Sequence, residues 1–91
     1  MSHASQTKRE IAQKRARVAH LTEFISENQL LAFQKVEAGF FASAADVFGE
    51  ISRFCSELHQ LTQEIQQLNF DLERIQEEQA ELSLSPATVA A

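Results

Sequence analysis

Residues 44–82 read AADVFGEISRFCSELHQLTQEIQQLNFDLERIQEEQAEL, and this stretch decides the fold. With Ala44 as position a of a heptad repeat abcdefg, every a and d position except Gln79 is apolar. The a positions are Ala44, Ile51, Leu58, Ile65, Leu72 and Gln79, and the d positions are Val47, Phe54, Leu61, Leu68, Ile75 and Leu82. Such spacing keeps one narrow stripe of a helix facing another helix. We call this stripe the seam, and it predicts a long helix packed against a partner helix.

A second and weaker helical pattern precedes the seam. Its apolar residues on one side of a helical wheel are Ile11, Val18, Leu21, Ile25, Ala32 and Val36. Lys14 and Asn28 lie within or beside this stripe. A lysine can lay its methylene groups along apolar surface while its ammonium group reaches water. We therefore expect a first helix, from about residue 7 to residue 38, that covers the seam.

The residues between the two patterns predict a tight turn. Gly39 can adopt the left-handed conformation that ends many helices, and Ser43 can cap the N-terminus of the next helix, with Asp46 three residues later. This interpretation predicts a turn at residues 39–43. The heptad register also continues backwards through Phe40 and Phe33. One uninterrupted helix from about Leu30 to Leu82 is therefore the alternative, and we favour the hairpin.

The distribution of charge supports the hairpin. The net charge is −5, yet residues 1–20 contain five basic residues and one acidic residue. Folding back at residues 40–42 places residue i near residue 82 − i. The basic segment 8–17 then lies against residues 65–74, close to an acidic run formed by Asp71, Glu73, Glu77, Glu78 and Glu81. Exposed ion pairs are weak, so they select the orientation of the helices more than they stabilise the hairpin. The alternative is that both charged segments are simply solvated helix faces.

The predicted fold class is all-α. It is an antiparallel hairpin of two long helices with coiled-coil packing, and part of a multi-helix bundle, because two helices alone bury little surface. The expected organisation is a flexible tail at residues 1–7 and a hairpin at residues 8–83, with its second helix at about 44–83. A flexible tail follows at residues 84–91, because Ser85 before Pro86 is biased away from the helical conformation.

Phenylalanine is concentrated near the predicted turn. Of seven Phe residues, six lie between residues 24 and 54, so a hairpin gathers them at its closed end. Contiguous exposed apolar surface usually marks an interface. We therefore predict a protein interface at this end and along the seam; the alternative is that these residues form one locally thick core. The interface residues are Leu30, Phe33, Phe40, Phe41, Val47, Phe48, Ile51, Phe54, Leu58, Leu61, Ile65, Leu68, Leu72 and Ile75.

The sequence contains no recognisable catalytic, cofactor or metal motif. Cys55 and His59 are one helical turn apart, but a structural zinc site needs four ligands. We expect Cys55 to be a small buried apolar residue. Glu77 and Glu78 are adjacent, so their side chains diverge on a helix. We predict no enzyme activity, no cofactor and no metal site.

These patterns indicate a non-enzymatic coiled-coil module for protein–protein interaction, acting as a small subunit, adaptor or chaperone in a larger assembly. A self-assembling, homo-oligomeric structural protein is the nearest alternative. Nucleic-acid binding through the basic N-terminal segment is a further alternative, opposed by the acidic remainder of the chain and by the absence of aromatic residues before Phe24. No apolar run is long enough to span a membrane. With a single cysteine and no apolar signal segment, we expect an intracellular, cytoplasmic protein.

Overall fold

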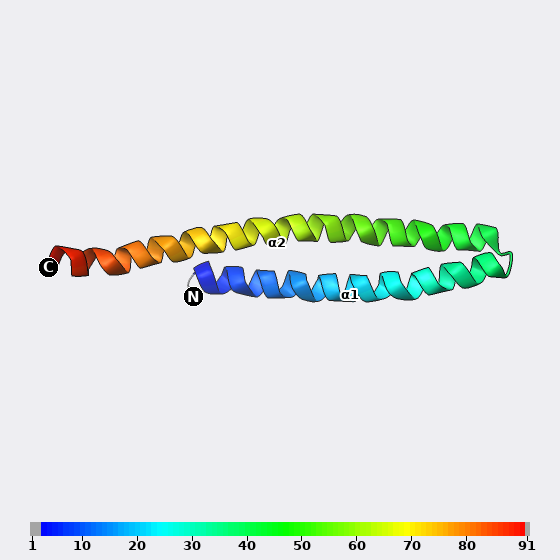
Figure 1. Cartoon of the computed structure of the whole chain (residues 1–91), viewed down its shortest axis with the longest axis horizontal. Helices are drawn as coiled ribbons and strands as arrows, with labels where there is room; N and C mark the ends of the chain where they lie inside the picture. Colours follow the sequence, from blue (N-terminus) through cyan, green and yellow to red (C-terminus); the bar gives the residue numbers. More distant parts are fainter. Residues whose placement is uncertain (1–2, 91) are drawn as a thin grey trace.

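The computed structural model describes the backbone of residues 3–90 and the side chains of residues 3–82. Helix α1 spans His3–Glu37, helix α2 spans Phe41–Ala90, and residues 3–90 contain no strand. The two helices run antiparallel and pack along the length of α1 (Figure 1). The predicted all-α helical hairpin is therefore confirmed, and the alternative of one uninterrupted helix is wrong. The molecule is a rod of 77 × 17 × 16 Å.

The turn is shorter than the sequence pattern suggests. Gly39 has φ of 84°, and its N–H donates to the Val36 carbonyl at 3.1 Å. The Phe40 N–H donates to the Lys35 carbonyl at 2.8 Å, which completes a Schellman motif. The Phe40 carbonyl then accepts the Ala44 N–H at 2.9 Å, the first bond of α2. Phe40 therefore belongs to the capping motif of α1 and also accepts the first hydrogen bond of α2. Ser43 consequently lies inside α2 and is not its N-cap.

This turn sets the register between the helices. The facing pairs Lys14–Glu64 and Phe24–Phe54 have residue numbers that add to 78, which is twice 39. The expected relation, with numbers adding to 82, is wrong by about one helical turn. Its physical cause is that the chain reverses at Gly39 and not at residues 40–42. The basic segment 8–17 consequently faces residues 61–70.

Both helices extend beyond their expected ends. Helix α1 begins at His3 rather than near residue 7, and the Thr7 hydroxyl donates to the His3 carbonyl at 2.8 Å. Helix α2 continues to Ala90 rather than ending near Ser83. Pro86 removes one backbone donor and its ring crowds the preceding turn, yet the backbone stays helical through it. Expectations for residues 1, 2 and 91 and for the side chains of residues 83–90 lie outside the described part.

Because α2 is longer than α1, its C-terminal part runs on alone. In Figure 1 the orange and red end of α2 extends past the N-terminus of α1. By the register above, His3 lies opposite residue 75, so residues 76–90 have no facing helix. We call residues 76–90 the overhang. Most of the predicted acidic run, from Glu77 to Glu81, lies there and not against the basic segment.

The packing face of α1 is a heptad stripe in its own right. The buried or half-buried residues of α1 that follow spacings of three and four are Ala4, Thr7, Ile11, Lys14, Val18, Leu21, Ile25, Asn28, Ala32 and Lys35. Val36, which was expected on this face, is 40% exposed because the stripe passes through Lys35 instead. Among the described side chains, the buried residues of the whole hairpin are Ala4, Ile11, Leu21, Ala32 and Ala44.

Candidate protein interface

An apolar patch lies exposed around the turn. Its members are 40–67% exposed, although each is a large apolar side chain. We call this set the turn patch, and it consists of Leu30, Phe33, Val36, Phe40, Phe41 and Phe48. It includes five residues of the interface predicted from sequence, which are Leu30, Phe33, Phe40, Phe41 and Phe48. A hydrophobic side chain this exposed gains little from folding of the hairpin alone.

Helical periodicity places the turn patch along one edge of the hairpin. Phe41 and Phe48 occupy position e of α2, whereas Glu57 and Glu64 occupy position g on the other side of the seam. Helix α1 bonds to the g side, because its Lys14 and Arg17 bind these two carboxylates. The e side of α2 is therefore left open. On α1, Val36, Phe33 and Leu30 follow one another around the helix, from the same open side at Val36 to the outer face at Leu30.

The rest of the predicted interface forms a half-covered stripe. Its residues on α2 are all half-buried, and they are Val47, Ile51, Phe54, Leu58, Leu61, Ile65, Leu68, Leu72 and Ile75. Within this stripe, the Phe54 ring stacks on the Phe24 ring of α1 with a centroid distance of 6.0 Å. One helix covers one side of a coiled-coil seam, so each of these residues keeps a face toward solvent. The seam is therefore packed but not enclosed.

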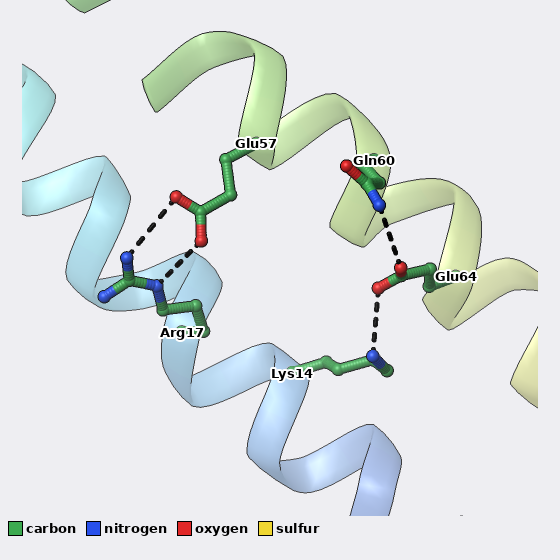
Figure 2. A network of polar contacts seen from close by, with 5 residues as sticks. All are labelled: Lys14, Arg17, Glu57, Gln60 and Glu64. Atoms are coloured by element: carbon green, nitrogen blue, oxygen red, sulfur yellow. Dashed lines mark hydrogen bonds and ion pairs between the residues drawn. The ribbon is translucent and has the colours of Figure 1, made fainter. Parts of the chain in front are cut away.

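The opposite edge of the hairpin is polar. Figure 2 shows Lys14 Nζ bound to Glu64 Oε2 at 2.9 Å, while Arg17 donates to both carboxylate oxygens of Glu57 at 3.1 and 3.3 Å. Gln60 Nε2 donates to the second oxygen of Glu64 at 3.3 Å. The sequence predicted that the basic segment would lie close to the acidic run from Asp71 to Glu81, whereas these partners lie nearer the turn, as the register requires.

Hydrogen bonding to Lys14 is the main influence on the carboxyl group of Glu64. It lowers the pKa of Glu64 below its ordinary value, together with the charge of Lys14 and a bond from Gln60, and desolvation opposes them only partly. Because the folded pKa is lowered, the pair stabilises the hairpin fully above the ordinary glutamate pKa. This contribution is lost as the pH falls through the lowered value.

We predict that Lys14→Met raises the pKa of Glu64 toward its ordinary value. The substitution keeps an unbranched side chain over the seam but removes the ammonium group that bonds to Glu64. NMR titration of the Glu64 side-chain carboxyl carbon measures the shift. Arg17→Met is the matched control, because it breaks the neighbouring pair with Glu57 and leaves the Lys14 bond in place. An unchanged Glu64 pKa in Lys14→Met would contradict this assignment.

A depression of about 290 Å³ is lined by Glu10, Lys14, Glu64, Gln67 and Leu68, and two of these side chains are already bound to each other. Residues 3–82 contain no group of three His, Cys, Asp or Glu side chains placed to hold a metal ion. Cys55 is exposed rather than buried, because it occupies the open e side of α2. None of residues 3–90 belongs to a helix long and apolar enough to cross a membrane.

Sequence reasoning missed one apolar residue. Phe70 is 64% exposed on the outer face of α2, away from the turn patch. Its heptad position, f, is the signal that could have found it, because f points away from the packing face. Phe24 and Leu31 are also exposed, at 43% and 41%, on the polar edge of α1.

Comparison with known proteins gave no match: no protein-family model, no curated protein and no solved structure is significantly similar to this chain.

Proposed function

We propose that this chain is a non-enzymatic coiled-coil module for protein–protein interaction, acting as a small subunit, adaptor or chaperone within a larger assembly. Its working surface is the turn patch together with the open side of the seam. Binding there is driven by burial of apolar side chains, and the exposed polar edge keeps the free chain in solution.

The observation that carries the proposal is the incomplete burial of α2. From Val47 to Ile75 every seam residue is only half-buried, although the heptad pattern is that of a fully enclosed interface. Among the described residues, α2 contributes only Ala44 to the buried core. Burial of apolar area contributes about 25 cal/mol per Å², so a helix that covers the open side would add substantially to stability.

Two observations weigh against nucleic-acid binding, one on the polar edge and one on the charge of the rest of the chain. Lys14 and Arg17, two of the five basic residues in the N-terminal segment, are already bound to Glu64 and Glu57. A phosphate would have to compete with these carboxylates. The acidic remainder of the chain would repel a phosphate further.

We also propose a cytoplasmic location, supported by the single exposed cysteine, since a thiol of this kind persists in a reducing compartment.

Circular dichroism and light scattering on the purified full chain test this function. We expect helicity and the thermal midpoint to depend on association, because an isolated hairpin with this small core is only marginally stable. Either an oligomer whose midpoint rises with concentration, or a poorly helical monomer that lacks its partner, agrees with the proposal. A fully helical, thermally stable monomer, with a midpoint independent of concentration, would show that the open surface needs no partner and would contradict it.

A further inference from the structure

We propose that the first partner of the turn patch is a second copy of this chain. The two hairpins would meet at their turns in an antiparallel arrangement, with their overhangs pointing in opposite directions. The overlap would form a short four-helix bundle around the paired turn patches. This inference rests on the proposed function and deepens it by naming the partner and the geometry.

The exposed area of the turn patch approaches what a specific dimer needs. Phe33, Phe40, Phe41 and Phe48 are 59%, 63%, 67% and 43% exposed. With an area of about 150–250 Å² for each aromatic side chain, these four alone expose roughly 350–580 Å² per copy. Leu30, Val36 and the adjoining half-buried seam add to this area. Two copies together therefore approach the lower limit of about 1,200 Å² for a specific interface.

The residues at the turn permit a symmetric contact. Residues 38–45 read AGFFASAA and carry no charge. A two-fold axis brings a surface against its own copy, so any charge near the axis meets an equal charge. Because this segment is uncharged, Phe41 and its symmetry mate can approach without repulsion. An unlike partner would gain no such advantage from a neutral centre.

The distribution of charge selects the antiparallel arrangement. Around the overhang, Glu73, Glu77, Glu78 and Glu81 are accompanied by only one basic residue, Arg74. If the two hairpins lay side by side in the same direction, these carboxylates would face their equivalents, and the basic starts of α1 would also meet. Like charges placed across an interface are unfavourable. Overlap of the turns alone keeps both charged ends of the two copies far apart.

The geometry has a measurable consequence for the length of the particle. The turn patch reaches from Gly39 back to Leu30 on α1 and forward to Phe48 on α2, a distance of about 14 Å at 1.5 Å per residue. Two rods of 77 Å that overlap over this distance make a particle roughly 140 Å long. Two hairpins that lie side by side in the same direction would instead remain roughly 80 Å long.

Light scattering after size exclusion, combined with small-angle X-ray scattering on the full chain, tests the proposal. We expect twice the chain mass and a maximum dimension of about 140 Å. The variant Phe41→Ser/Phe48→Ser should have half that mass, a length near 77 Å where the hairpin persists, and a lower thermal midpoint than the wild type, because helicity depends on association. Phe70→Ser is the matched control: Phe70 is 64% exposed but lies outside the turn patch, so this variant should remain dimeric.

Several results would overturn the proposal. They are a monomeric wild type, a dimer about 80 Å long, a dimer that persists in Phe41→Ser/Phe48→Ser, and a dimer that Phe70→Ser dissociates equally. A wild-type monomer that binds phosphatidylcholine vesicles would identify a lipid surface as the occupant and overturn it as well. If the double variant loses its helices, the wild-type particle length still decides between the arrangements. A poorly helical wild-type monomer would refute the dimer but leave the proposed function standing, whereas a stable, fully helical monomer refutes both.

Discussion

Leu21→Asp is expected to unfold the hairpin. Leu21 is 0% exposed and is the largest fully buried side chain among the described residues. The substitution removes its apolar contacts and places a carboxylate where neither water nor a cationic partner has been provided. The expected loss is on the order of 4 kcal/mol, a large share of the roughly 5–15 kcal/mol by which natural domains are stable. Circular dichroism and urea denaturation measure this loss.

Leu31→Asp is the matched control for this experiment. It is the same substitution on the same helix, but Leu31 is 41% exposed and lies outside the turn patch, so the new carboxylate reaches water. We expect this variant to keep the helicity of the parent chain. If Leu21→Asp also kept the parent's helicity and urea midpoint, then Leu21 would not lie between the two helices and the packing face of α1 would be misassigned.

Gly39→Ala is expected to destabilise the hairpin by about 1–2 kcal/mol, the cost of the left-handed conformation for a residue with a Cβ atom. Gly39 has φ of 84° in the Schellman motif. Nothing lies within 4 Å of a Cβ atom built there, so the strain is purely that of the backbone. The urea midpoint should fall, with the slope of the transition unchanged.

Gly49→Ala provides a control of opposite sign. Gly49 lies in the interior of α2, does not have a positive φ, and also has open space around a built Cβ atom. Alanine there should stabilise the helix by roughly 0.5–1 kcal/mol relative to glycine. If both alanine variants shifted the midpoint in the same direction, the turn would not depend on the left-handed conformation of Gly39.

The sequence was sufficient to predict both helices, their antiparallel packing and the glycine that ends the first one. It did not predict the register, because the residues around Gly39 are compatible with both a Schellman motif and a capped loop of five residues. The choice between them moved the facing residues by about one helical turn. It also exchanged the acidic partners of Lys14 and Arg17 for Glu64 and Glu57. A local difference in backbone hydrogen bonding thus decided a long-range arrangement of charge.

The packing face of α1 was only partly visible in the sequence because polar residues interrupt it. Lys14 was expected to reach water from this face, but its ammonium group is bound to Glu64. Thr7 donates to the His3 carbonyl, and Asn28 donates to the Phe24 carbonyl at 2.9 Å. Such partners allow polar side chains to lie in a half-buried stripe. Hydropathy alone cannot show that these bonds exist, so it understated the regularity of α1.

The sequence by itself determined that this protein is a pair of long helices with an apolar seam, because heptad spacing and helix propensity are local properties of the chain. It also determined that the aromatic residues gather near the turn. Only the tertiary structure decided which of them are covered. Helix α1 lies toward position g of α2, where its cations meet Glu57 and Glu64, and this leaves Phe41, Phe48 and Cys55 on the open side. The physical reason is that one helix can cover only one side of a seam, and the side it covers depends on contacts between residues far apart in the chain.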